Sequence, residues 1–136
     1  MKIQTNYNLL ISIRGIGFVT AIALIVATEN FTRFDDHRKF ACYCGIVPFE
    51  YQSGTSIKGK KKISRFANKR LKALLSNAAC TSIQFNPEMK LYYERRIQEG
   101  KSKMSTQNII RNKIVARVFA VVQRGTPYVD TFKYAA

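Results

Sequence analysis

Acidic residues are scarce in this sequence of 136 residues, with eight Asp and Glu against 23 Lys and Arg. A nuclease that binds two Mg²⁺ ions needs several carboxylates that converge on one site. The acidic residues here form no metal-binding cluster along the chain: Glu29, Asp35, Asp36, Glu50, Glu88, Glu94, Glu99 and Asp130. We therefore predict no metal site in this chain and exclude a metal-dependent nuclease that works alone.

Cysteine and histidine are also few. Cys42, Cys44 and Cys80 are an odd number without disulfide-framework spacing, which is typical of a reducing compartment. With His37 as the one histidine, we expect buried thiols and no zinc site. No basic-then-apolar signal peptide opens the chain, and the longest apolar stretch, residues 15–27, is too short to cross a bilayer. We expect a cytoplasmic, nucleoid-associated protein without membrane contact.

Positive charge is present in large excess, with a formal net charge of +15. Such an excess repels itself in a compact chain, which indicates a polyanionic partner. The alternative is a basic protein without a role in nucleic-acid binding. A composition of 46% hydrophobic and 23% charged residues is globular, and the length suits a single domain over residues 1–136.

Apolar periodicity predicts a mostly α fold. Two helices, at about 7–13 and 18–27, are expected to be joined by a tight glycine turn, the second of them as a core helix. Further helices are expected from Asp35 or Asp36 to Cys44, from Ser64 to about Phe85, from Pro87 to Glu99, and from Lys103 to Gln123. Between them, residues 46–62 lack helical periodicity and contain Pro48, Gly54 and Gly59, which predicts one long irregular loop or a small hairpin.

The turn sequence Arg14-Gly15-Ile16-Gly17 resembles that of a helix-hairpin-helix motif, at about residues 7–28. In that motif the backbone N–H groups of the turn face a phosphate, as they do at a helix N-terminus. Arg14, Gly15 and Gly17 are thus candidate nucleic-acid-binding residues, without base specificity. The alternative is an ordinary helical hairpin whose glycines allow close packing.

A run of eight cations continues from the irregular loop onto the next predicted helix, and no acidic residue lies between Glu50 and Glu88. Cations in this arrangement can follow a phosphate backbone and release its counterions. The alternatives are a solvated basic face and a disordered arm. The run consists of Lys58, Lys60, Lys61, Lys62, Arg65, Lys69, Arg70 and Lys72, all but Arg70 of which we single out as candidate nucleic-acid contacts.

Ser53 lies just before this basic run, in Gln52-Ser53-Gly54. A serine hydroxyl attacks a phosphodiester only if a base takes its proton and cations stabilise the charge on phosphorus. The cations are present, but no base is evident, so the residues alone indicate a turn. Tyr92 and Tyr93 are of a type that stacks on nucleotides, although core or interface positions are the more common role.

Several motifs in order resemble the C-terminal transposase domain of the DEDD-type insertion-sequence transposases, which include the Piv and MooV DNA invertases. The resemblance covers residues 9–128 and rests on the turn motif together with Phe31-Thr32-Arg33-Phe34, Phe40-Ala41-Cys42-Tyr43-Cys44-Gly45-Ile46-Val47-Pro48, Gln52-Ser53-Gly54 and Gly100-Lys101. It implies a DNA-binding domain that supplies Ser53 as the nucleophile for strand cleavage and exchange in DNA transposition. It divides the chain into the hairpin, a serine loop and basic run at about 46–72, and a helical remainder at 73–128.

The resemblance also implies partners. Family members have an N-terminal RuvC-like domain whose four acidic residues bind Mg²⁺, and some are guided by a bridge RNA. We expect this chain to lack that domain, as a truncated gene, a fragment or an excised domain would, and to be inactive alone. Expected partners are DNA, a bridge RNA, and further copies or an intact transposase. One departure is Leu71-Lys72, where the family has Leu-Arg and a bidentate phosphate contact.

Two further functions stay open from the sequence. The chain is alternatively a DNA- or RNA-binding protein without catalysis, or an inhibitory remnant that pairs with intact transposase. Loss of Ser53 would leave the binding function unchanged, whereas unchanged transposition on overexpression of the chain would contradict the inhibitory one.

Overall fold

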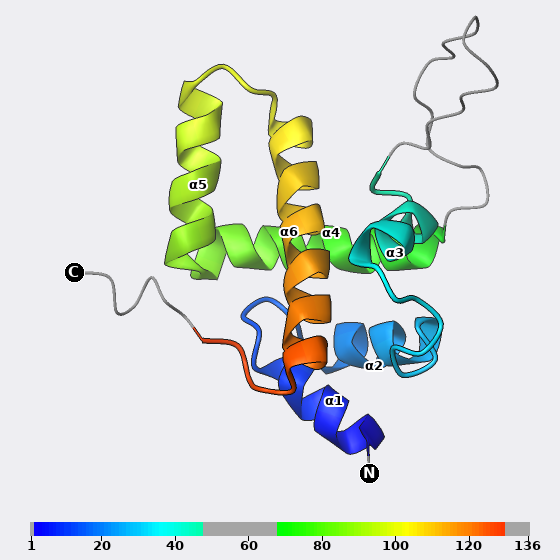
Figure 1. The fold of residues 1–136 in the computed structure, drawn as a ribbon. Helices are drawn as coiled ribbons and strands as arrows, with labels where there is room; N and C mark the ends of the chain where they lie inside the picture. The colour runs from blue at the N-terminus through cyan, green and yellow to red at the C-terminus, as the bar shows by residue number, and fades with distance from the viewer. Residues whose placement is uncertain (1, 48–67, 130–136) are drawn as a thin grey trace, which may run out of the picture.

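The computed structural model describes residues 2–47 and 68–129 (Figure 1), which form six helices and no strand. The mostly α fold predicted from the sequence is therefore confirmed. In chain order the helices are α1 (Lys2–Ile11), α2 (Phe18–Ala27), α3 (His37–Cys44), α4 (Lys69–Phe85), α5 (Pro87–Gln98) and α6 (Lys103–Arg124).

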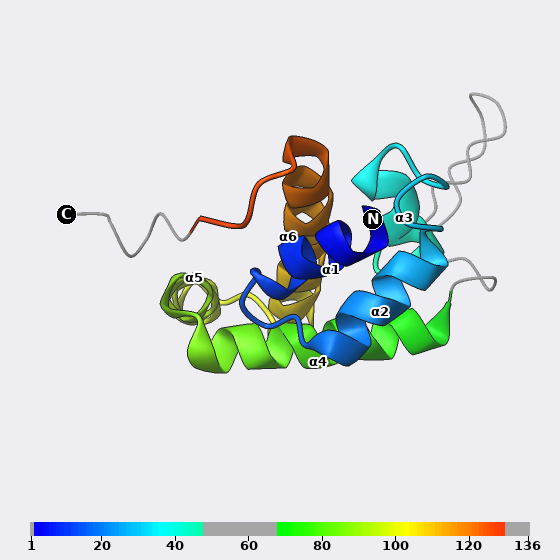
Figure 2. The same cartoon turned by 90° about the horizontal axis from the view of Figure 1, so that it is seen from below.

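Helix α6 runs through the middle of the molecule and packs against α1, α3, α4 and α5. Figures 1 and 2 both show α5 on one side of α6 and α3 on the other, and in Figure 1 α4 crosses behind α6. Leu10, Phe40, Leu75 and Ile110 are completely buried in the one hydrophobic core that these helices share. The edge-to-face rings of Phe31 and Phe119, with centroids 5.3 Å apart, close the core beside α3.

Several helix ends lie where capping chemistry predicts them. Asp36 accepts a hydrogen bond from the backbone N–H of Arg38 at the start of α3, and Gly45 ends that helix at φ 78°. Asn86 caps α5 ahead of a proline at its first position. The predicted ends of α5 and α6 are right to within one residue.

Two predicted helix starts are wrong. The first helix begins at Lys2 and not near Tyr7, and it ends two residues early, at Ile11. Helix α4 begins at Lys69 and not at Ser64, because the backbone of Asn68 is extended and its side-chain oxygen accepts the N–H of Leu71. Asparagine is as effective an N-cap as serine.

The prediction of α2 as a core helix holds for one face only. Thr20, Ala21, Leu24 and Ile25 are buried, whereas the opposite face exposes its large apolar side chains. These are Phe18, Val19, Ile22 and Val26. Among the described residues, no helix is both long and apolar enough to span a membrane.

Candidate nucleic-acid interface

The chain positions on either side of residues 48–67 lie next to each other. The backbone N–H of Asn68 donates to the carbonyl oxygen of Tyr43 at 2.7 Å, and its side-chain Nδ2 donates to the Tyr43 hydroxyl at 3.4 Å. The start of α4 is thereby fixed against the last turn of α3. The intervening predicted site residues lie outside the described part of the chain: Ser53, Lys58, Lys60, Lys61, Lys62 and Arg65.

Helix α6 binds the backbone of Ile46, on the N-terminal side of residues 48–67. The carbonyl oxygen of the buried Ile46 accepts hydrogen bonds from Asn108 Nδ2 at 2.9 Å and from Asn112 Nδ2 at 3.1 Å. Two amides from one helix thus fix the backbone just before Pro48. Sequence reasoning missed both asparagines. The one available signal was their i, i+4 spacing, which places two amide side chains on the same face of the helix.

A cavity of about 550 Å³ opens beside these flanks, between α2 and the first turn of α4. The exposed apolar residues of α2 line one wall, and Arg33, Tyr43, Asn68 and Arg70 line the other. The guanidinium of Arg33 lies 4.9 Å from the centre of the Tyr43 ring and 5.2 Å from that of Phe34. The cavity therefore combines an apolar wall with two cations, and sequence reasoning had assigned no role to Arg33.

Lys69 and Arg70 are exposed on the first turn of α4, and Lys72 is half-buried. The described end of the basic run therefore presents at least two cations to solvent, next to the cavity. A cation at a helix N-terminus is opposed by the helix dipole, so these charges lower helix stability at the place where an anion would offset them.

The glycine turn between α1 and α2 packs on the other end of α4. Gly15 has φ 97°, and a Cβ there would overlap the Ser82 hydroxyl and lie 3.1 Å from the carbonyl oxygen of Ala78. Gly17 precedes α2 with ordinary backbone angles, φ −89° and ψ −178°, and a Cβ there would meet nothing within 4 Å. Gly15 is therefore required for packing, whereas Gly17 borders open space.

Arg14, the first residue of the same turn, also contacts α4. Its exposed guanidinium donates to the carbonyl oxygen of Phe85, at the end of α4, with Nη1 3.4 Å from that oxygen. Lys69 lies at the beginning of this helix, and 17 residues of α helix at 1.5 Å each span about 25 Å. The turn and the described end of the basic run, Lys69 to Lys72, thus lie at opposite ends of α4.

The described residues contain no group of three or more His, Cys, Asp and Glu that could hold a metal ion. The cysteines differ from one another: Cys44 is buried, Cys42 is partly buried and Cys80 is exposed. Burial raises the pKa of the Cys44 thiol to about 12. The expectation of buried thiols is thus right for Cys44 and wrong for Cys80.

Several known proteins are similar to this chain in sequence. The profile of the Transposase IS116/IS110/IS902 family matches residues 7–94. An insertion element IS110 protein of 43.6 kDa from Streptomyces coelicolor is 32% identical over 121 residues, which are 88% of this chain and 29% of that protein. The pilin gene-inverting protein of Moraxella bovis is 31% identical over 128 residues, which are 93% of this chain and 40% of that protein.

The chain therefore spans well under half the length of these curated relatives. The family match covers residues from α1 to α5, including the glycine turn, both flanks of residues 48–67, and the whole of α4. On this match, the chain belongs to the IS116/IS110/IS902 family of transposases and is similar to proteins of insertion elements and of DNA inversion.

Proposed function

We propose that this chain is a DNA-binding domain that supplies Ser53 as the nucleophile for strand cleavage and exchange in DNA transposition. The observation that supports it is the meeting of the two flanks of residues 48–67. Tyr43 and Asn68 lie in hydrogen-bond contact, and Arg33 and Arg70 line the adjacent cavity. A phosphodiester at this place would lie among cations, which phosphoryl transfer requires.

The proposed step exchanges one phosphorus–oxygen bond for another. The Ser53 Oγ loses its proton to a base and bonds to phosphorus, while the bond from phosphorus to one deoxyribose oxygen breaks. That oxygen leaves as a hydroxyl group after it takes up a proton. A second strand reverses the step, because its free hydroxyl attacks the phosphoserine and releases the serine. Religation needs no outside energy source, because the phosphoester bond is conserved throughout.

We expect the base that takes the Ser53 proton, and the metal ion, to come from outside this chain. The described residues hold no carboxylate cluster that fits Mg²⁺, so we derive no step through a metal in this chain. We propose that a separate acidic domain completes the site, that the assembly is an oligomer, and that a bridge RNA is a further partner. DNA inversion by the pilin gene-inverting relative is chemistry of the same kind.

The test is covalent trapping of Ser53 on DNA. The chain is mixed with end-labelled insertion-element DNA, Mg²⁺ and the acidic domain of a relative, and adducts that resist denaturant are measured. Ser53→Ala should abolish the adduct and leave DNA affinity unchanged, whereas Ser56→Ala, in the same segment, should retain both. An adduct that forms without Ser53 would contradict the proposal. DNA binding without any adduct would favour a non-catalytic binding protein.

A further inference from the structure

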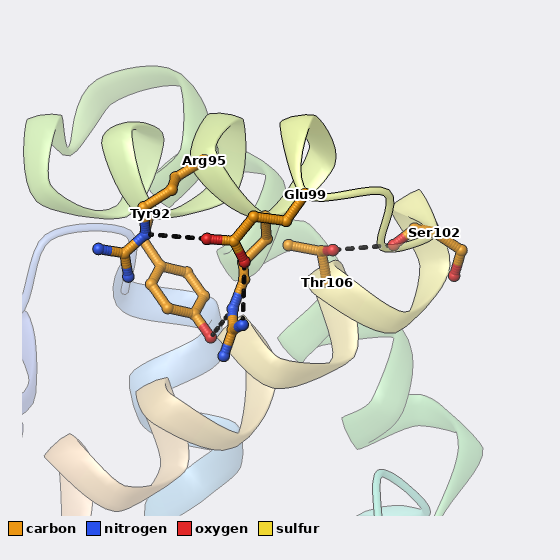
Figure 3. Close-up of polar contacts among 6 residues, drawn as sticks. Tyr92, Arg95, Glu99, Ser102 and Thr106 are labelled. Atoms are coloured by element: carbon orange, nitrogen blue, oxygen red, sulfur yellow. Dashed lines mark hydrogen bonds and ion pairs between the residues drawn. The ribbon is translucent and has the colours of Figure 1, made fainter.

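Three cations surround one tyrosine ring between α5 and α6. The guanidinium carbons of Arg95 and Arg96 lie 5.6 and 5.4 Å from the centre of the Tyr92 ring, and Lys113 Nζ lies 4.6 Å from it. In Figure 3, Tyr92, Arg95 and Glu99 lie together near the first turn of α6, which Ser102 and Thr106 mark. We name Tyr92, Arg95, Arg96, Lys113 and the adjacent Arg117 the α5–α6 cluster.

The carboxylates beside this cluster neutralise only part of its charge. Glu99 is shared, with 3.2 Å to Arg96 and 4.0 Å to Arg95. Glu88 pairs with Arg117 at 2.7 Å. Among the described residues, Lys113 forms no ion pair. Four cations thus face two carboxylates, and the remaining acid of α5, Glu94, lines a different cavity.

Stabilisation of the fold does not explain three cations on one ring. One cation over a tyrosine contributes about 0.5–1 kcal/mol at an exposed site, but each further cation repels those already present. The Tyr92 hydroxyl accepts a hydrogen bond from Arg96 Nε at 3.2 Å, so Tyr92 orders the guanidinium group of Arg96. Ordered cations with incomplete neutralisation are typical of an anion-binding surface.

The α5 part of this cluster lies beyond the opposite end of α4 from the described end of the basic run. Helix α5 begins two residues after the end of α4, whereas Lys69 begins α4, and the length of α4 is about 25 Å. Figures 1 and 2 place α5 on the opposite side of α6 from α3, where Asn68 is bound. Because the screening length at physiological salt is about 8 Å, charges at the two ends of α4 are largely screened from each other.

We propose that the α5–α6 cluster binds the phosphate backbone of a second nucleic-acid segment, distinct from the segment at the basic run. This inference rests on the proposed DNA-binding function. Cations already occupy the surroundings of the Tyr92 ring, so the contact is with phosphate and not with bases, and it is independent of sequence. The phosphate chemistry is the same in DNA and in a structured RNA. One domain would then hold two nucleic-acid segments at once.

The first experiment measures the affinity of the whole chain for a short labelled DNA duplex and for an RNA duplex of the same sequence, over a range of salt. The wild type should show two binding events per chain, and Arg95→Gln/Lys113→Gln should weaken one of them about tenfold and reduce its salt slope by roughly 1 to 2. Lys2→Gln/Lys39→Gln removes the same charge from α1 and α3 and should retain wild-type values. Arg95→Lys/Lys113→Arg preserves charge and should retain binding, which separates charge from folding.

The second experiment mixes donor- and acceptor-labelled duplexes and measures energy transfer between them. The wild type should join two duplexes. Arg95→Gln/Lys113→Gln should abolish the joining of two duplexes and still bind one duplex at the basic run. Lys60→Gln/Lys61→Gln/Lys62→Gln should also abolish joining and still bind one duplex at the α5–α6 cluster. If Arg95→Gln/Lys113→Gln weakens binding of the RNA duplex and leaves binding of the DNA duplex unchanged, RNA is the occupant of the cluster.

Two results would overturn the inference. One is an Arg95→Gln/Lys113→Gln variant that behaves like the Lys2→Gln/Lys39→Gln control. The other is a wild type that never joins two duplexes, which would indicate one continuous surface. In either case, DNA binding that still depends on the basic run would leave the proposed function standing. A wild type that binds neither duplex would contradict the proposed function itself.

Discussion

The backbone N–H of Asn68 donates to the carbonyl oxygen of Tyr43 at 2.7 Å, which joins the start of α4 to the last turn of α3. The two residues are 25 positions apart. Closing a chain segment of this size costs conformational entropy, and the hydrogen bonds at its two flanks help to offset that cost. The two ends of residues 48–67 are thus held by contacts made outside that segment.

The first prediction concerns Asn108 and Asn112, which both donate to the carbonyl oxygen of Ile46. Either single alanine variant should lower the free energy of unfolding by about 1 kcal/mol, because the other amide still donates. The double variant should cost more than the sum of the two single variants, about 3–4 kcal/mol, since it leaves a buried carbonyl without either donor. Urea denaturation measures this, with exposed Asn77→Ala as the control. Strict additivity would contradict the shared role.

The second prediction separates the two glycines of the turn. Gly15→Ala should destabilise the fold by more than about 2 kcal/mol, because φ 97° disfavours a side chain and the new Cβ would overlap Ser82. Gly17→Ala meets open space and should change the unfolding midpoint little. Thermal unfolding of both variants measures the difference.

Gly17→Ala also tests the helix-hairpin-helix hypothesis. If a phosphate approaches the turn as that motif predicts, the added methyl group should weaken DNA binding while the fold stays intact. Unchanged DNA affinity in a stable Gly17→Ala protein would favour the ordinary helical hairpin instead. Gly15→Ala cannot decide between the two, since Gly15 packs on α4 in either case.

Local sequence signals were sufficient for much of the fold. Asp36 and Gly45 mark the ends of α3, and Asn86 with Pro87 marks the start of α5, because capping is a matter of neighbouring residues. The predicted start of α4 was wrong because local signals alone do not choose between two good caps, Ser64 and Asn68. The contact of Asn68 with Tyr43, which the sequence does not reveal, favours the later one.

The candidate site depends more on distant contacts. That Gly15 packs on Ser82, and that Arg14 reaches Phe85, places the turn at the far end of α4 from the basic run, which no spacing predicted. The ring of cations on Tyr92 joins residues from two helices. The apolar pattern of α2 predicted burial, but apolarity alone does not tell a buried face from an exposed one.

The third prediction concerns thiol reactivity. Exposed Cys80 should react with iodoacetamide at neutral pH, whereas Cys44 should stay protected until the chain unfolds, because burial raises its pKa to about 12. Above about pH 9 the unfolded thiol ionises and the folded one does not. The unfolding free energy should therefore fall as pH rises from about 9 toward 12. Cys44→Ala should remove this part of the pH slope; an identical slope would contradict the assignment.

The fourth prediction uses Asn68 to separate helix capping from charge. Asn68→Asp keeps an oxygen that accepts the N–H of Leu71, so stability should stay close to wild type, while Asn68→Ala should lose about 1 kcal/mol. The new carboxylate, however, lies next to Lys69 and Arg70 in a stretch without acidic residues. Asn68→Asp should therefore weaken DNA binding and reduce the salt slope by about 1.

Gln4→Glu is the matched control, because it adds the same charge at an exposed position on α1. Its DNA affinity should change less than that of Asn68→Asp at every salt concentration, since the charge at Gln4 acts only through the net charge of the chain. Asn68→Ala should bind DNA nearly as well as the wild type at a temperature where it is folded. If Asn68→Asp and Gln4→Glu weaken binding equally, the beginning of α4 is not part of the DNA-binding surface, and the interface must be sought at the glycine turn or on α5.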